Sequence, residues 1–314
     1  MMKKYVVYLL LVAILIILPL FFGEYYVNLG SQIMVAVVFA ASLNLLVGYG
    51  GLTSLGHATY LGLSAYTSAW LFQNFGMTHD YTALIALVFT TFVGAIFGWI
   101  SLRASGLSFL MLTLALSQII WGIGYRWVGL TNGDNGIAGL TRPTPFGVNL
   151  ENSNNFYWFC LIITIVSLFF IARIVNSPFG STLKGTRDQE KRMSALGYNV
   201  WMIRWVTFVM ASFFGAVSGL MYIYLNKYIH PSVISITSSA EALLCVIAGG
   251  AGTLAGPILG SILIVLLKNY VSGFVERWNM LLGIIFVFIV IFMPAGMAPG
   301  FTQLKNRLFG GKKP

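Results

Sequence analysis

Long apolar segments, each about as long as a bilayer core is thick, dominate this sequence. They lie near residues 5–22, 30–48, 55–73, 82–101, 106–125, 156–175 and 203–225. A helix needs about 20 apolar residues to cross a bilayer, because it rises only about 1.5 Å per residue. Of the 314 residues, 58% are hydrophobic and 8% are charged, which excludes an ordinary soluble globular protein. The sequence therefore predicts an all-α polytopic membrane protein, with a single transmembrane domain over residues 1–314.

The first apolar run follows Lys3 and Lys4 and resembles a signal sequence in its charge. The residues after it, Gly23-Glu24-Tyr25, lack the small-x-small pattern of a cleavage site. We therefore expect residues 5–22 to stay as a first span, with the amino terminus in the cytoplasm.

A charged island separates two of the apolar segments. Residues 173–204 hold eight charged side chains, six of them basic. Short loops rich in Lys and Arg stay in the cytoplasm, so we expect the 176–202 loop to be cytoplasmic. Thr186 and Gln189 have the spacing of a capping box, and Gly197 offers a left-handed stop. These signals predict a short helix from about Arg187 to Leu196, which is either a membrane-surface helix or a docking element for a soluble partner.

A glycine-rich interruption divides the apolar stretch near 240–268. One straight span here would leave the basic tail, residues 297–314, outside the cell. Two short helices joined by a hinge return the chain to the outer face, so that the last segment, 279–294, runs inward. The sequence therefore predicts about ten apolar helical segments, including a broken pair whose hinge residues are Gly249, Gly250, Gly252, Gly256 and Pro257.

Residues typical of catalysis, metal binding or nucleic-acid binding are not gathered anywhere in the chain. There is no HExxH, no Gly-x-Ser-x-Gly and no GxxxxGK[ST] phosphate loop, and the three histidines are scattered. The net charge of +10 comes from loops and tails beside apolar spans, which positive-inside topology explains better than a nucleic-acid interface. We expect no catalytic residues, no metal site and no nucleic-acid partner.

Uncharged polar side chains inside the spans are candidates for a solute pathway. Hydrogen-bonding groups in a cavity between helices suit a polar solute, but the same groups also join helices to one another. Glu241 sits near the start of the broken pair and either faces the pathway or extends to the membrane interface. The candidate pathway residues are Asn44, Ser54, His57, Ser117, Gln118 and Glu241.

Several motifs together make the chain resemble the LivM-type permease subunits of branched-chain amino acid ABC importers. The likeness covers roughly residues 35 to 295. Its carriers are the Ser42–Ala58 stretch, the Gly62–Tyr66 stretch, Asn132–Ile137, the charged Arg187–Asn199 run and the glycine-rich Gly249–Pro257 segment.

The resemblance implies a permease of the cell inner membrane, with both termini cytoplasmic, that moves branched-chain amino acids or a related small polar solute by alternating access. It implies a second homologous permease subunit of the LivH type, two cytoplasmic ABC ATPase subunits and an extracytoplasmic solute-binding protein. ATP and Mg would bind the ATPases, so no cofactor is expected on this chain. An ion-coupled secondary transporter is the alternative. The residues that would contact the ATPases are Arg187, Asp188, Gln189, Glu190, Arg192, Ala195 and Gly197.

Overall fold

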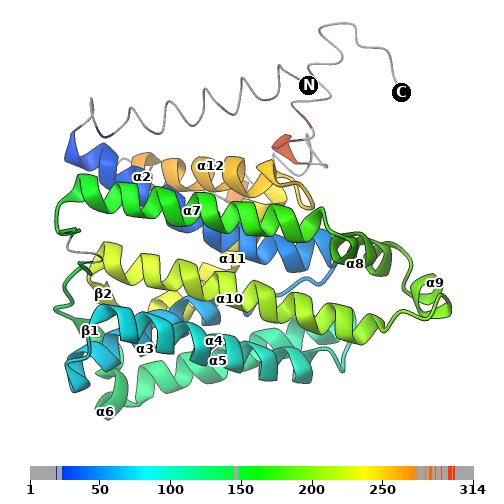
Figure 1. The fold of residues 1–314 in the computed structure, drawn as a ribbon, viewed down its shortest axis with the longest axis horizontal. Helices are drawn as coiled ribbons and strands as arrows, with labels where there is room; N and C mark the ends of the chain where they lie inside the picture. Colours follow the sequence, from blue (N-terminus) through cyan, green and yellow to red (C-terminus); the bar gives the residue numbers. More distant parts are fainter. Residues whose placement is uncertain are drawn as a thin grey trace, which may run out of the picture.

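The computed structural model describes residues 23–144 and 148–271, together with residue 19 and scattered positions between 273 and 300. Its long helices lie side by side (Figure 1), and the predicted all-α polytopic fold is confirmed. The main helices are α2 (Glu24–Asn44), α3 (Ala58–Phe75), α4 (His79–Ser101), α5 (Leu107–Arg126), α7 (Ser153–Val175), α8 (Pro178–Asp188), α9 (Glu190–Ala195), α10 (Val200–Asn226), α11 (Ile236–Gly249) and α12 (Ala255–Val271). The predicted segments 5–22 and 279–294 and the tail 297–314 fall outside the continuous stretches described.

Shorter elements complete the fold at its two ends. Helices α8 and α9 project from one end, which we call the α9 end, whereas the two short strands mark the opposite, ribbon end (Figure 1). The strands pair antiparallel, with Ile137 opposite Ile229. The short elements are the π-helical turn η1 (Leu45–Tyr49), α6 (Val128–Thr131), η2 (Gly133–Asn135), β1 (Ile137–Ala138), β2 (Tyr228–Ile229) and η4 (Pro231–Ile234).

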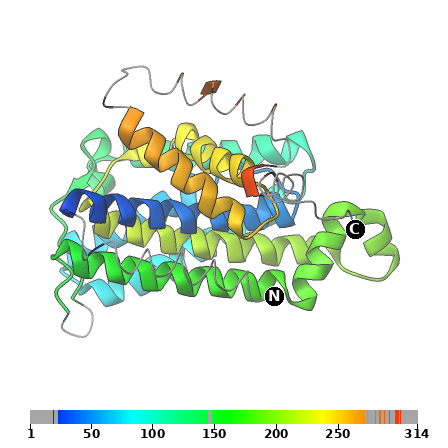
Figure 2. The same cartoon turned by 90° about the horizontal axis from the view of Figure 1, so that it is seen from above.

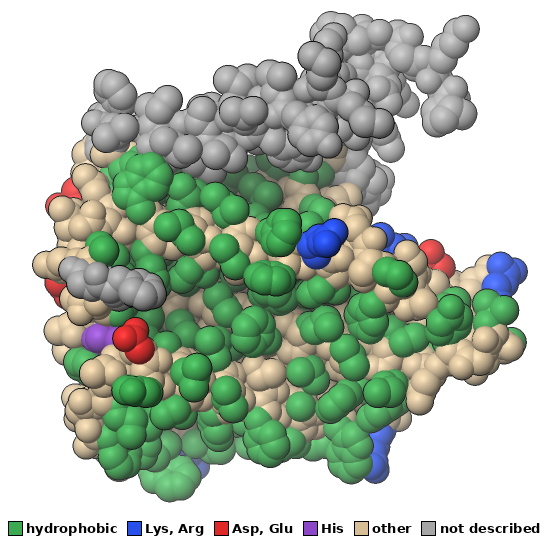
Figure 3. Space-filling view, viewed as in Figure 1, with side chains coloured by type: hydrophobic (Ala, Val, Ile, Leu, Met, Phe, Trp, Pro, Cys, Tyr) green, Lys and Arg blue, Asp and Glu red, His purple; other side chains and the backbone are tan. Residues whose placement is uncertain are grey.

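Five helical segments in the described part of the chain are long and apolar enough to cross a membrane. α4, α5 and α7 expose large apolar side chains, including Leu84, Phe92 and Ile162. Figure 3 shows hydrophobic side chains over the middle of one face, with most of its visible charged side chains toward the two ends. Apolar surface of this extent matches a lipid environment, because no hydrophobic penalty arises against acyl chains.

Helix α2 occupies the centre of the bundle. It packs against α7, α10, α11 and α12, and Val38 and Leu43 on it are fully buried. Its residues therefore contact these four helices between the ribbon end near Glu24 and the α9 end near Asn44.

The glycine-rich break reverses the chain, as predicted. Helices α11 and α12 run antiparallel beside each other over α2 (Figure 2). Their backbones touch at glycines: a Cβ on Gly249 would lie 1.8 Å from the carbonyl oxygen of Gly256, and one on Gly260 would lie 1.8 Å from that of Cys245. The two half-helices thus form a hairpin whose helices approach as closely as small residues permit.

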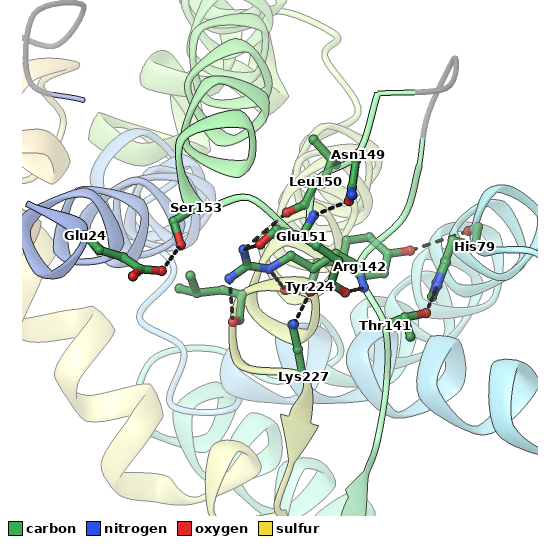
Figure 4. A network of polar contacts seen from close by, with 11 residues as sticks. Glu24, His79, Thr141, Arg142, Asn149, Leu150, Glu151, Ser153, Tyr224 and Lys227 are labelled. Atoms are coloured by element: carbon green, nitrogen blue, oxygen red, sulfur yellow. Dashed lines mark hydrogen bonds and ion pairs between the residues drawn. The ribbon is translucent and has the colours of Figure 1, made fainter. Parts of the chain in front are cut away.

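Arg142 anchors the ribbon end of the bundle (Figure 4). Its Nε donates to the Tyr224 carbonyl oxygen at 3.1 Å, and its Nη1 donates to that of Leu150 at 3.2 Å. The guanidinium also lies 4.3 Å from the centre of the Phe156 ring. Close by, Glu151 pairs with Lys227, and this hydrogen bond lowers the pKa of the Glu151 carboxyl. The network joins the β1–α7 loop to the end of α10.

Replacing Arg142 with leucine is expected to destabilise the protein by about 1–3 kcal/mol for each buried carbonyl left without a donor. The thermal unfolding midpoint of the purified protein in detergent should fall accordingly. Arg126, an exposed basic residue at the same end, supplies the control, because Arg126→Leu removes equal charge without opening this network. Equal midpoints for the two variants would contradict the anchoring role.

Candidate functional site

The hinge between α11 and α12 is held by the side chain of Asn44, which lies at the last residue of α2. Asn44 Oδ1 accepts from the Gly252 amide at 2.9 Å, and Asn44 Nδ2 donates to the Thr253 carbonyl oxygen at 2.9 Å. The hinge residues Gly250 and Gly252 have φ of 117° and 77°, a backbone region that favours glycine. One amide side chain therefore satisfies both a donor and an acceptor that the break in the helix exposes.

The predicted hinge residues flank this contact. Gly249 is the last residue of α11, and Gly256 and Pro257 lie in the first turn of α12. The Gly256 amide donates to the Thr253 hydroxyl at 3.0 Å, and that hydroxyl donates to the Gly250 carbonyl oxygen at 2.8 Å. The break lies against the end of α2 nearer α9.

Arg187 connects the hinge region to the charged loop. Its Nη1 donates to the Gly48 carbonyl oxygen, in η1, at 2.6 Å. A Cβ on Gly48 would lie 2.2 Å from the Gly252 amide nitrogen, so η1 and the hinge are in backbone contact. The Arg187 side chain also covers Gly51, where an added Cβ would lie 2.6 Å from Arg187 Cγ. A single long side chain therefore bridges the end of α8 to the place where α2 meets the hinge.

The prediction of a helix from about Arg187 to Leu196 is wrong about where the helix begins. Helix α8 begins at Pro178, after Ser177, whose hydroxyl accepts from the Gly180 amide at 3.3 Å. Thr186 lies inside α8, and its hydroxyl donates to the Leu183 carbonyl oxygen at 2.7 Å instead of capping a new helix. Gln189 leaves helical geometry and separates α8 from α9. Gly197 has φ of 87°, so its left-handed stop is confirmed.

Some predicted contact residues of this loop form ion pairs, whereas the others are exposed without an ion pair among the described residues. Asp188 accepts from Arg187 Nε at 2.8 Å. Glu190 pairs with Arg204 on α10 at 2.9 Å, which ties α9 back to the bundle. The remaining predicted contact residues are exposed on the projecting loop, namely Gln189, Arg192, Ala195 and Gly197.

Four of the six predicted pathway residues, Asn44, Ser54, His57 and Ser117, are buried, and their side chains make hydrogen bonds within the protein. His57 Nε2 lies 2.7 Å from Ser42 Oγ, and its ring lies between Phe39 and Tyr60. Ser117 Oγ accepts from the Thr59 hydroxyl at 2.8 Å. Ser54, also buried, accepts from the Gly56 amide at 3.3 Å.

Two predicted pathway residues are placed differently. The Gln118 side-chain nitrogen is buried, with no hydrogen-bond partner among the described residues. Glu241 instead lines a cavity of about 400 Å³ that lies between α2, α3, α10, α11 and α12. Its carboxylate accepts from Lys268 Nζ at 3.0 and 3.1 Å.

Sequence reasoning missed the other polar residues of this cavity. Gln32, Asn226 and Asn269 line it, and Asn269 Nδ2 donates to Gln32 Oε1 at 3.2 Å. Their pattern in the sequence is unremarkable, since they come from three separate helices. One signal in the sequence was available for this site. Glu241 and Lys268 lie at similar distances on either side of the hinge, and a hairpin brings such residues close together.

The fold is that of a polytopic membrane protein, with a helical hairpin docked on a central helix and a charged loop reaching its hinge. The chain belongs to the family described as branched-chain amino acid transport system / permease component, whose model matches residues 25–290. Members of this family are permease components, so the chain is a transport subunit and not a catalytic one.

Curated relatives agree with this family. The chain is 26% identical over 317 residues to the high-affinity branched-chain amino acid transport system permease protein LivM of Escherichia coli, which covers 93% of this chain and 75% of that protein. It is 25% identical over 309 residues to the protein of the same name from Salmonella typhimurium, covering 91% and 72%. A probable LivM permease of Methanocaldococcus jannaschii is 28% identical over 159 residues, covering 46% of each chain. No solved structure matches this chain.

Proposed function

We propose that this chain is one of two permease subunits of an ATP-driven importer for branched-chain amino acids. Its partners would be a second homologous permease, two cytoplasmic ABC ATPases that bind ATP and Mg, and an extracytoplasmic solute-binding protein. The family match and the names of its relatives support this assignment. The solute would be taken up across the cell inner membrane.

The α9 end would face the cytoplasm. Basic side chains are concentrated there, at Lys184, Arg187, Lys191, Arg192 and Arg204, as expected for a short cytoplasmic loop. The ribbon end would then face the binding protein, and both termini would be cytoplasmic. Within this arrangement residues 1–314 form a single transmembrane permease domain.

The observation that carries the proposed coupling route is the contact of Arg187 with Gly48. Exposed residues of α9 would bind the ATPase, and the rigid α8 would transmit its movement inward. Arg187 would pass that movement to η1, which is in backbone contact with the hinge of the α11–α12 hairpin. Packed helices transmit small shifts well, because interiors are dense and change between discrete arrangements.

Alternating access would follow if the hairpin takes two positions against α2. Asn44 supplies two hydrogen bonds to the hinge that can be made in one position and exchanged in the other. ATP binding would favour one position only if the ATPase dimer holds the α8–α9 loop differently in its two states. The hinge, rather than the interior of either helix, is where the chain can bend.

An affinity pull-down of the tagged protein in mild detergent tests the proposal. We expect a second permease and two P-loop ATPases to co-purify, with ATPase activity that Gly197→Pro, or charge reversal at both Arg187 and Arg192, lowers strongly. The control is Gly122→Ala on α5, because proline at Gly122 would break that helix. A chain that purifies alone and transports in response to an ion gradient would instead be an ion-coupled secondary transporter.

A further inference from the structure

We infer that the cavity between α2 and the α11–α12 hairpin is a solute site for a zwitterionic amino acid with a branched hydrocarbon side chain. The inference rests on the proposed function and deepens it by naming residues that would hold the solute. The cavity of about 400 Å³ falls within the range of about 300–1,000 Å³ typical of small-molecule sites.

One end of the cavity presents opposite charges side by side. Glu241 and Lys268 lie on the two helices of the hairpin, and their side chains are 25% and 47% exposed. An amino acid likewise carries two opposite charges close together, because its α-ammonium and α-carboxylate are attached to one carbon. A zwitterion could therefore bind between these groups, with its ammonium against Glu241 and its carboxylate against Lys268, without leaving either charge unpaired.

Amide side chains border the charged pair. Gln32 on α2 and Asn269 on α12 line the same cavity and are hydrogen-bonded to each other. Amides both donate and accept, so they can complete the hydrogen bonds of an ammonium or a carboxylate. The charged pair and these two amides thus come from α2, α11 and α12.

Most of the remaining cavity lining is apolar, apart from Asn226, Ser232 and Ser238, and this apolar surface selects among solutes. A small polar solute such as urea would leave this surface against water, whereas a branched hydrocarbon side chain would bury it. The apolar lining includes Val35, Phe39, Leu61, Val233, Ala242 and Ile264.

The floor of the cavity connects it to the hinge. The Phe39 ring lines the cavity and lies 5.5 Å, centre to centre, from the His57 ring in a stacked arrangement. Further along α2, Asn44 holds the hinge. A solute here would touch both helices of the hairpin and α2, so a change in hairpin position would change the shape of its site.

A purely structural ion pair is the competing explanation, and a charge swap separates the two. The variants are Glu241→Gln, Lys268→Met and the double swap Glu241→Lys with Lys268→Glu. A swap restores a structural pair. It also reverses the orientation that a zwitterion must adopt, which would point its hydrocarbon side chain away from the apolar wall. Asp134→Asn is the matched control, because Asp134 pairs with His230 at the same end and does not line the cavity.

The measurements use the whole transporter with its partner subunits. Labelled leucine uptake is measured in proteoliposomes, and leucine binding is measured on the purified complex without binding protein. We expect each single variant to lose uptake and binding by at least about tenfold, as for one lost charge-assisted contact. The double swap should restore thermal stability but not uptake, and Asp134→Asn should bind leucine as the native complex does. Isoamylamine and 4-methylpentanoate, which each carry one of the two charges, should compete weakly.

Two results would overturn the inference separately from the proposed function. If the native complex drives ATP-dependent leucine uptake but the double swap transports fully, the pair is structural and the solute binds elsewhere. Unchanged binding in both single variants has the same meaning. If the native complex shows no ATP-dependent uptake, the proposed function itself fails, and the inference fails with it.

Discussion

Replacing Arg187 with methionine is expected to reduce solute uptake by at least about tenfold while the protein stays folded in the membrane. Methionine retains much of the apolar stem that covers Gly51 but removes the guanidinium that donates to the Gly48 carbonyl oxygen at 2.6 Å. Without that hydrogen bond, α8 can move without moving η1. ATP hydrolysis should therefore continue while transport stops, and uptake per ATP hydrolysed measures the change.

Two controls separate this internal contact from surface charge. Lys191→Met removes one positive charge from the neighbouring exposed helix, which leaves the Gly48 contact intact, so its uptake per ATP should stay near the native value. Arg187→Lys keeps the charge but has one donor group in place of a planar fork, so it should transport at an intermediate level. If Lys191→Met and Arg187→Met were equally impaired, the loop would act through its charge and the proposed link to the hinge would be wrong.

The membrane-spanning helices were predictable because their signal is local. Crossing a bilayer requires about 20 apolar residues, whatever the neighbours are. The reversal at the hinge was also predictable, since Gly250 and Gly252 sit within an apolar stretch and basic residues lie in the tail beyond it. The depth of the hinge was not predictable, because it depends on where Asn44 meets the break.

The charged loop shows how competing local signals mislead. Thr186 and Gln189 have capping-box spacing, but Ser177 followed by Pro178 is an equally good helix start nine residues earlier. The earlier start wins because Leu183 of α8 is fully buried against the bundle. Tertiary burial of one apolar face thus decides between two caps that are locally comparable.

The polar residues of the candidate site were only partly predictable. Burial was anticipated for Asn44, His57 and Ser117, but a sequence does not tell whether a buried polar group faces a cavity or another helix. The structure pairs His57 with Ser42 and Ser117 with Thr59. The cavity depends on helices α2, α11 and α12 meeting in space, so Gln32 and Asn269 carried no signal of their own.

Replacing Gly48 with alanine is expected to disrupt the docking of the hinge on α2. The new Cβ would lie 2.1 Å from Asn44 Oδ1 and 2.2 Å from the Gly252 amide nitrogen. The backbone contact cannot be relieved by rotating a side chain, so either η1 or the hinge must move, and both Asn44 hydrogen bonds to the hinge would be strained. Overpacking of this kind costs about 1–3 kcal/mol or more.

The matched control for this change is Gly122→Ala on α5. A Cβ there meets nothing within 4 Å, so alanine should keep or slightly raise stability, because it favours a helix over glycine by about 1 kcal/mol. Thermal unfolding midpoints in detergent and leucine uptake are measured for both variants. We expect Gly48→Ala to lower the midpoint and to lose most of its uptake. A Gly48→Ala protein that matched Gly122→Ala in both measurements would mean that η1 and the hinge separate without cost, and that movement could not pass from the α8–α9 loop to the hairpin by this route.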